Sequence, residues 1–220
     1  MTLLLQRFFS SLEDLFRKRE GWDRWDAKKV ICSTLAPHTL PSAKFSRPSA
    51  RKISFWVDVS GSVAYLADFI VNLIVAACKD QDVQVVIGSE AHPQTVLPKS
   101  FFRENRRWTE YLGDSYIRNF EDQVANFLKR ERLEQGTTIV IWSDYMDINA
   151  DNLEKLARLF RPYKVVWLCS HNGKDPAYGG NESFKLERFA KKEGHLFLWG
   201  IDGLDGVRKA LREINVKKRR

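Results

Sequence analysis

The sequence predicts an α/β protein whose doubly wound, mostly parallel sheet is covered by helices on both faces. Short apolar runs rich in β-branched residues alternate with longer segments in which apolar residues recur at three- and four-residue steps. Strands separated by helices of this length need right-handed crossovers and parallel pairing. With 220 residues, 44% of them hydrophobic and 12% aromatic, the chain is long enough to bury one substantial core.

The predicted elements follow one another in a regular order after residue 51. Strands are expected at Ile53 to Val57, Val83 to Ile87, Thr138 to Trp142, Val165 to Leu168 and Leu196 to Trp199. Helices are expected up to Ala77, from about Ile117 to Arg132, from Leu153 to Phe160, from Phe184 to Lys192 and from Leu204 to Ile214. This alternation is typical of consecutive crossover units.

The first 50 residues have a different character. Apolar residues between Leu5 and Phe16 recur at helical spacing and predict an amphipathic helical arm, which packs on its own domain or on a partner. From Pro37 to Arg51 the chain is rich in proline, serine and basic residues without periodicity, which predicts a linker. We therefore expect an arm and linker in 1–50, the α/β domain in 51–216 and a basic tail in 217–220, which is either solvated or an electrostatic contact.

Charge and cysteine content narrow the class of protein. The chain has 36 Lys and Arg against 28 Asp and Glu, a net charge of +8 that favours anionic partners without selecting among them. Its three widely spaced cysteines fit neither a disulfide framework nor a Cys-x-x-Cys metal site. The apolar stretch from Leu3 is interrupted by Arg7, unlike a secretory or membrane-spanning segment. We expect a cytoplasmic protein that does not insert into membranes.

Acidic residues follow two of the expected strands. The first strand leads into Asp58, Ser60 and Ser62, and the strand that ends at Trp142 leads into Ser143 and Asp144. Because the carboxyl ends of parallel strands share one edge of a sheet, the two aspartates should lie on the same edge. They converge if their strands are neighbours.

The first of these loops has the residue types of a site for a hard cation. Asp58, Ser60 and Ser62 can direct one carboxylate and two hydroxyls at one point, with Gly61 allowing a tight turn. Mg²⁺ prefers such oxygen ligands and keeps several waters, and Mn²⁺ accepts the same donors. In the alternative interpretation a serine caps the following helix and Gly61 only relieves a turn. The second acid, Asp144, favours the metal site.

This pattern resembles the metal-ion-dependent adhesion site of von Willebrand factor A domains, which begins with Asp-x-Ser-x-Ser after the first strand. The resemblance implies a three-layer sandwich with six strands in the order 3-2-1-4-5-6, and it places Asp58 and Asp144 on adjacent strands. Ser143-Asp144-Tyr145 stands where the family has Thr-Asp-Gly. The family's remaining threonine ligand corresponds best to Ser115, with Asp114 as an alternative ligand.

Within this superfamily, the region from Gly113 to Ser170 is most similar to the CoxE-like branch, which is encoded beside MoxR-type AAA+ ATPases. The similarity lies in a helix followed by Thr-Ile-Val-Ile-Trp-Ser-Asp-Tyr-Met-Asp, then Leu-Glu-Lys-Leu-Ala-Arg-Leu and Lys-Val-Val-Trp-Leu. The resemblance covers residues 52 to about 200. It implies a MoxR-type ATPase, or the target of such an ATPase, as the partner.

The residue types favour binding over catalysis. Two carboxylates balance the charge of a divalent ion, and neutral hydroxyls leave a coordination position that a partner's carboxylate can complete. The two loops contain no His, Lys or Cys that could act as nucleophile or general base. We therefore expect a non-enzymatic, metal-dependent adaptor. Asp147 is expected either to support the ligands from behind or to be an N-terminal helix charge.

Two alternatives remain at this stage. The segment from Phe101 to Trp108 interleaves aromatic and basic residues. Its Arg103, Arg106, Arg107 and Trp108 could contact a protein partner or stack on and neutralise nucleic acid, or the segment could be a partly packed loop. A phosphatase of the haloacid dehalogenase type would use Asp58 as its nucleophile. That mechanism needs a second acid two residues further on, where this chain has Ser60.

Overall fold

The computed structural model describes residues 7, 8, 11, 53–78, 83–89, 92–102, 107–113, 120–133, 137–145, 152–170, 181–201 and 204–218. The strands are β1 Ile53–Asp58, β2 Val83–Gly88, β3 Thr95–Val96, β4 Thr138–Ser143, β5 Lys164–Cys169 and β6 Leu196–Leu198. The α-helices are α3 Ala64–Cys78, α4 Phe120–Glu131, α5 Leu153–Phe160, α6 Asn181–Lys192 and α7 Leu204–Lys218. Two 3₁₀ turns, η2 Lys99–Phe102 and η3 Trp108–Tyr111, lie between β3 and α4.

The sheet has six strands in the order β3-β2-β1-β4-β5-β6. All neighbours pair in parallel except β2 and β3, which are antiparallel. The doubly wound α/β fold is therefore confirmed, and the strand order is the one that the resemblance to von Willebrand factor A domains implies. The two strands that follow β1 are added on one side of it, whereas β4, β5 and β6 are added on the other side, so the topological switch point lies between β1 and β4. Ligands of open α/β sheets bind at such a switch point.

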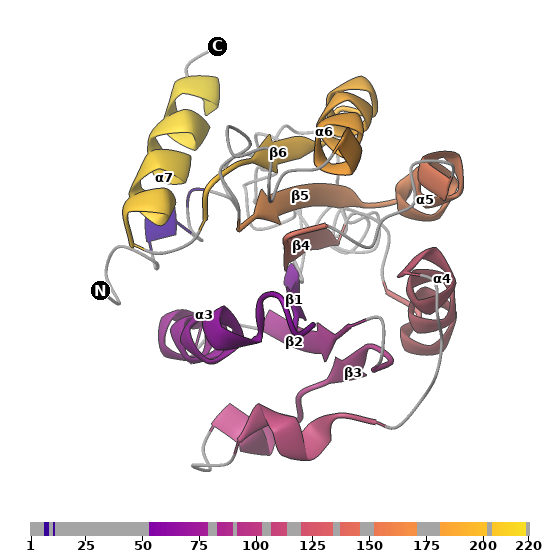
Figure 1. Ribbon diagram of the computed structural model, residues 1–220, viewed down its shortest axis with the longest axis vertical. Helices are drawn as coiled ribbons and strands as arrows, with labels where there is room; N and C mark the ends of the chain where they lie inside the picture. The colour runs from indigo at the N-terminus through magenta and orange to yellow at the C-terminus, as the bar shows by residue number, and fades with distance from the viewer. Residues whose placement is uncertain are drawn as a thin grey trace, which may run out of the picture.

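Helices cover both faces of the sheet (Figure 1), with α3 and α7 on one side and α4, α5 and α6 on the other. Side chains alternate along each strand, so Phe55 and Val57 of β1 join the core under α3 and α7, whereas Trp56 joins the core under α4 and α5. Asp58 follows Trp56 by two residues. The pleat therefore directs Asp58 toward the α4 side of the sheet.

Most elements lie where the sequence predicts them, and α5 has the predicted bounds. The antiparallel strand β3 was missed, because two residues between Pro93 and Pro98 are too few for an alternating pattern to be visible. Helix α7 continues past the expected end at Ile214, through Lys218. The proposed linker from Pro37 to Arg51 lies outside the described residues.

A short part of the N-terminal arm is described, and it packs on the domain itself. Arg7, Phe8 and Ser11 are helical, and Phe8 is buried in the core under α3 and α7. In Figure 1 this indigo segment lies beside α7. At Phe8, therefore, the N-terminal arm packs on its own domain.

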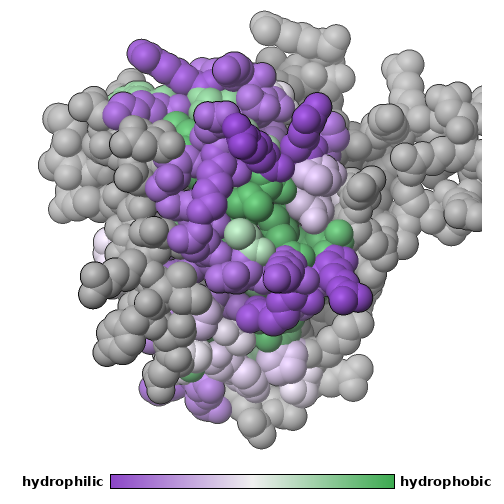
Figure 2. Space-filling model, turned by 90° about the vertical axis from the view of Figure 1, so that its right-hand side faces the viewer, coloured by the Kyte–Doolittle hydropathy of each residue, from purple (hydrophilic) through white to green (hydrophobic). Residues whose placement is uncertain are grey.

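The outer surfaces of α4, α5 and α6 are hydrophilic, with a narrower strip of hydrophobic side chains between them (Figure 2). Lys155 of α5 pairs with Asp122 of α4, and Arg158 pairs with Glu154 one helical turn away at 2.5 Å. Within the described segments, none of the helices combines the length and apolar character that a membrane span requires.

Candidate functional site

The candidate site lies where β1 ends and α3 begins. Asp58 is the last residue of β1, and Ser60 and Ser62 lie in the turn before Ala64, the first residue of α3. The amide of Val59 donates to the carbonyl of Gly88 on β2 over 2.9 Å, which ties the start of the turn to the neighbouring strand. The turn is therefore held at the carboxyl edge of the sheet.

The carboxylate of Asp58 is fixed by hydrogen bonds at both oxygens. Its Oδ1 accepts the backbone N–H of Ser60 over 2.8 Å, and its Oδ2 accepts the hydroxyl of Ser143 over 2.5 Å. The first bond is local, whereas the second comes from the neighbouring strand β4. The side chain is partly exposed.

The two serine hydroxyls predicted as ligands are next to each other. Ser60 Oγ and Ser62 Oγ lie 3.2 Å apart, and Ser60 Oγ also hydrogen-bonds the Asp58 carboxyl. Ser62 is exposed and Ser60 partly exposed, so both can be reached from solvent. Gly61 does not have the role that we expected: it does not adopt the left-handed conformation, and a Cβ there would meet open space. Any small residue therefore fits the turn.

Ser143 and Tyr145 are part of the site, although neither was among the residues predicted as ligands. Ser143 Oγ accepts the backbone N–H of Tyr145 over 2.9 Å while donating to Asp58. Tyr145, which stands where the family has glycine, adopts a left-handed φ of 57°. Its ring is buried against Trp167 and Phe197, and its hydroxyl donates to the Ile141 carbonyl over 2.6 Å. This packing holds a tyrosine in a conformation that usually favours glycine.

Asp144 follows directly after β4, the strand that pairs with β1, so it lies at the same edge of the sheet as Asp58. It is fully buried, and its backbone carbonyl accepts the hydroxyl of Ser183 from the first turn of α6 over 3.3 Å. Its carboxyl is close enough to Asp58 to act on it electrostatically. Because Asp58 is partly exposed and Asp144 is not, Asp58 is the more accessible of the two carboxylates.

The electrostatics of the site favour a bound cation. Burial raises the pKa of the Asp58 carboxyl above its ordinary value, hydrogen bonds from Ser143 and Ser60 oppose that rise, and the charge of Asp144 adds to it. Among the described residues, no lysine or arginine forms an ion pair with Asp58. An ionised Asp58 would therefore be stabilised by a cation at this edge.

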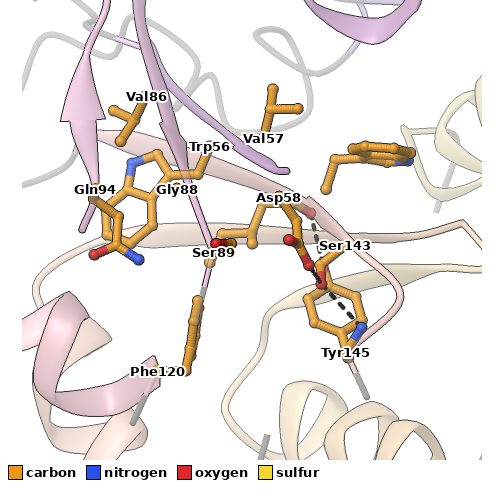
Figure 3. Close-up of a pocket in the computed structure, with 12 residues that line it drawn as sticks. Trp56, Val57, Asp58, Val86, Gly88, Ser89, Gln94, Phe120, Ser143 and Tyr145 are labelled. Atoms are coloured by element: carbon orange, nitrogen blue, oxygen red, sulfur yellow. Dashed lines mark hydrogen bonds between the residues drawn. The ribbon is translucent and has the colours of Figure 1, made fainter. Parts of the chain in front are cut away.

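A small cavity of about 40 Å³ lies beside Asp58, on the α4 side of the sheet. Figure 3 shows Asp58, Ser143 and Tyr145 together on one side of it, with Phe120 and Gln94 on the other. The remaining lining is mostly apolar and comes from β1, β2 and β4. A water needs about 10–15 Å³ on this measure, so the cavity has room for about three.

The donor set fits a hard cation rather than zinc. Among the described residues, no group of three His, Cys, Asp or Glu side chains comes together, so a thiolate- or imidazole-rich site is absent from this part of the chain. Asp58, Ser60 and Ser62 offer oxygen donors only, with Asp144 supplying a second negative charge. This chemistry fits Mg²⁺ or Mn²⁺, both of which accept carboxylate, hydroxyl and water ligands.

Several predicted site residues lie outside the described residues. These are Ser115, Asp114, Asp147, Arg103 and Arg106. Gly113, two residues before Ser115, is described. Its carbonyl lies 3.1 Å from Nδ1 of His92, and a Cβ placed at Gly113 would lie 3.4 Å from the ring of Pro93. Gly113 is therefore tied to the segment between β2 and β3.

Trp108 corrects one prediction. Its ring is buried in the core under α3, with an exposed fraction of 8%, and its indole N–H donates to Asp68 of α3. Phe101, at the other end of the aromatic and basic segment, is also buried. Neither ring is free to stack on a base, because both anchor the 3₁₀ turns to the domain. Arg107 is exposed.

Comparisons with known proteins find a similar solved structure but no match by sequence. A scan against protein families finds no match, and no curated protein matches the sequence. Among solved structures, the chain is similar to the conserved hypothetical protein BatB from Bacteroides thetaiotaomicron, with 11% sequence identity and a TM-score of 0.49. That match covers 77% of this chain and 100% of the other. The strand order and pairing of this chain define its fold.

Proposed function

We propose that this chain is a metal-dependent protein-binding module. Asp58, Ser60 and Ser62 would hold Mg²⁺ or Mn²⁺ at the carboxyl edge of the sheet, and a carboxylate from a partner protein would complete the coordination. The observation that carries this proposal is the convergence of a fixed Asp58 carboxylate with two serine hydroxyls that lie 3.2 Å apart. All three lie at an accessible edge of the sheet, next to the topological switch point between β1 and β4.

Each residue has a distinct role in this proposal. Asp58 contributes the direct carboxylate ligand, and Ser143 holds it in place. Asp144 contributes a second negative charge from a buried position, and Ser115 or Asp114 would supply the remaining donor from the loop after Gly113. When bound, the ion would supply an open, positively charged coordination position for an anionic oxygen.

The same residues favour binding over hydrolysis. The two motif loops contain carboxylates and hydroxyls but no His, Lys or Cys that would act as a nucleophile or general base. A phosphatase mechanism would need an acid at position 60, yet Ser60 is there and directs both its amide and its hydroxyl toward Asp58. We therefore propose a non-enzymatic role.

The resemblance to the CoxE-like branch suggests the partner. We propose a MoxR-type AAA+ ATPase, or a protein on which such an ATPase acts, as the donor of the carboxylate. A nucleic acid is less well supported, because Trp108, the best stacking residue of the candidate surface, is buried.

Isothermal titration calorimetry with MgCl₂ and MnCl₂ tests the metal site directly. We expect saturable binding by the wild-type chain, loss of binding in Asp58→Asn, and unchanged binding in the control Asp205→Asn. Asp205 is exposed and pairs with Arg208 on α7, so its substitution removes a carboxylate elsewhere. Absence of metal uptake by the folded wild-type chain would overturn the proposal.

Partner binding is tested with the purified full chain and a purified MoxR-type ATPase from the native host. We expect a complex in Mg²⁺ that dissociates in chelator and does not form with Asp58→Ala. A complex that persists equally under both conditions would show that the partner uses another surface.

A further inference from the structure

Two large apolar side chains are exposed among the described residues, and both lie near the candidate metal site. Tyr65 has an exposed fraction of 71% and Phe184 of 41%. Tyr65 is in the first turn of α3, three residues beyond Ser62, and Phe184 is in the first turn of α6. Exposed aromatic residues are frequent at the centres of protein interfaces. Their position at the same edge as the oxygen donors indicates a shared binding surface.

Phe184 is held in place by the residues around the site. The preceding residue, Ser183, donates its hydroxyl to the backbone carbonyl of Asp144 over 3.3 Å. The ring of Phe184 packs against Trp199 with centroids 5.2 Å apart, and Trp199 packs in turn on Phe197 at 4.9 Å. An aromatic ring fixed in this way loses little conformational entropy when a partner packs against it.

Tyr65 lies on the other side of the site. Val63, Ala67 and Ile70 bury the inner face of α3, which leaves Tyr65 on the outer face. Helices α3 and α6 cover opposite faces of the sheet (Figure 1). The two aromatic residues therefore flank the carboxyl ends of β1 and β4 from opposite sides.

Two exposed basic side chains lie close to Phe184 on α6, and the glutamate between them, Glu187, is paired with Lys191. Lys185 follows Phe184 directly, and Arg188 lies one helical turn further along α6; both are exposed. The chain as a whole carries a net charge of +8. This charge is complementary to an acidic segment, whose attraction would be felt over about 8–10 Å at physiological salt.

We propose that the edge binds an acidic peptide segment of a partner protein in which the metal-bound carboxylate has an apolar neighbour. This inference rests on the proposed function and adds a sequence preference to it. The apolar neighbour would pack on the aromatic pair Phe184 and Trp199 or on Tyr65, and a further acidic residue would lie near Lys185. The metal alone would bind any accessible carboxylate. The aromatic rim, which consists of Phe184, Trp199 and Tyr65, would determine which residues can flank that carboxylate.

The test uses the full chain and synthetic heptapeptides with aspartate fixed at the centre and every residue type at the flanking positions. In Mg²⁺ we expect apolar flanks to bind about tenfold more tightly than glycine flanks. Phe184→Ser and Tyr65→Ser should reduce this preference while calorimetric Mg²⁺ affinity stays within about twofold of wild type. Lys185→Glu should remove the preference for a second acid without loss of buried contacts.

Matched variants keep the result interpretable. Phe184→Tyr should retain the preference, and so should Tyr163→Ser, which removes a half-buried aromatic residue at the opposite edge of the sheet. The melting temperature of every variant confirms that it is folded. If Mg²⁺ and the aspartate peptides bind but the flanks make no difference, the aromatic rim proposal is wrong and the metal site stands. If the wild-type chain takes up no Mg²⁺, the proposed function itself is wrong.

Discussion

The hydroxyl of Ser143 on β4 donates to Oδ2 of Asp58 on β1 over 2.5 Å and so joins the two strands at the topological switch point of the sheet. Ser143 Oγ also accepts the backbone N–H of Tyr145. One hydroxyl therefore orients the carboxylate that we propose as the main metal ligand and supports the turn after β4. Residues that orient a ligand in this way commonly affect metal affinity strongly.

Ser143→Ala should weaken Mg²⁺ binding about tenfold, because the carboxylate of Asp58 loses the donor that orients it. It should also lower the free energy of unfolding by about 1–3 kcal/mol, since the buried Tyr145 amide loses its acceptor. Calorimetry and urea unfolding measure the two effects. Ser143→Thr should retain both properties.

The neighbouring Ser170 provides a matched control. It is fully buried at the end of β5, and its hydroxyl makes no hydrogen bond within the described part of the chain. Ser170→Ala should therefore leave Mg²⁺ affinity unchanged. Equal loss of affinity in both alanine variants would contradict a specific role for Ser143.

Asp58→Asn should make the metal-free protein more stable at neutral pH, because it removes a partly buried carboxylate whose charged form is disfavoured by desolvation and by the nearby charge of Asp144. The same substitution should abolish stabilisation by Mg²⁺. In the wild-type chain, Mg²⁺ at 100 times its Kd should add about 3 kcal/mol to the free energy of unfolding. Urea unfolding with and without Mg²⁺ measures both changes. A metal-free variant that is less stable than wild type would show that Asp58 is mainly a structural residue.

Tyr145→Gly should destabilise the protein although it removes an unfavourable backbone conformation. Relief of the positive φ is worth about 1–2 kcal/mol, whereas loss of a buried aromatic ring costs about 3–5 kcal/mol. The net loss should therefore be about 1–4 kcal/mol by urea unfolding. Arg132, which is exposed and has a φ of 48°, is the control: Arg132→Gly relieves strain without removing a core side chain and should not destabilise.

Gly206→Ala should destabilise the first turn of α7. A Cβ at this position would lie 2.0 Å from the backbone carbonyl oxygen of Gly200, so the helix would have to move away from the loop after β6. We expect a loss of about 1–3 kcal/mol, measured by thermal or urea unfolding. Gly61→Ala, where a Cβ meets open space, should leave both stability and metal affinity unchanged.

Acidification should weaken the fold through His195. Burial lowers the pKa of this imidazole, and nearby Lys164 lowers it further while Glu193 opposes the shift. Its Nδ1 accepts the indole N–H of Trp167 over 3.3 Å, an interaction that requires this nitrogen to be unprotonated. Between the lowered pKa and about 6.5, the unfolded chain binds more protons than the folded chain, so stability is complete above about pH 6.5 and falls below it.

Urea unfolding at pH 7.5 and pH 5.5 checks this sign. His195→Gln should reduce the loss of stability between the two pH values, because glutamine carries no charge at either. A wild-type protein that becomes more stable on acidification in the same range would contradict the assignment to His195.

The α/β class and most of the elements were predictable from the sequence, because long apolar patterns report directly on burial. Leu153 to Phe160 was predicted with its observed bounds, and the motif Asp58, Ser60 and Ser62 was visible as a set of oxygen donors. Local spacing was sufficient here, since these three residues belong to one turn and share its backbone geometry.

Other features were decided by the tertiary structure. Pairing between β1 and β4 brings Ser143 to Asp58 across 85 positions of sequence, and packing of Tyr145 against β5 and β6 determines that a tyrosine adopts a left-handed φ. Trp108 looked like a surface residue because its neighbours are basic, yet it is buried against α3. Such contacts depend on which distant segments meet, and a single sequence records its own spacing but not its long-range neighbours.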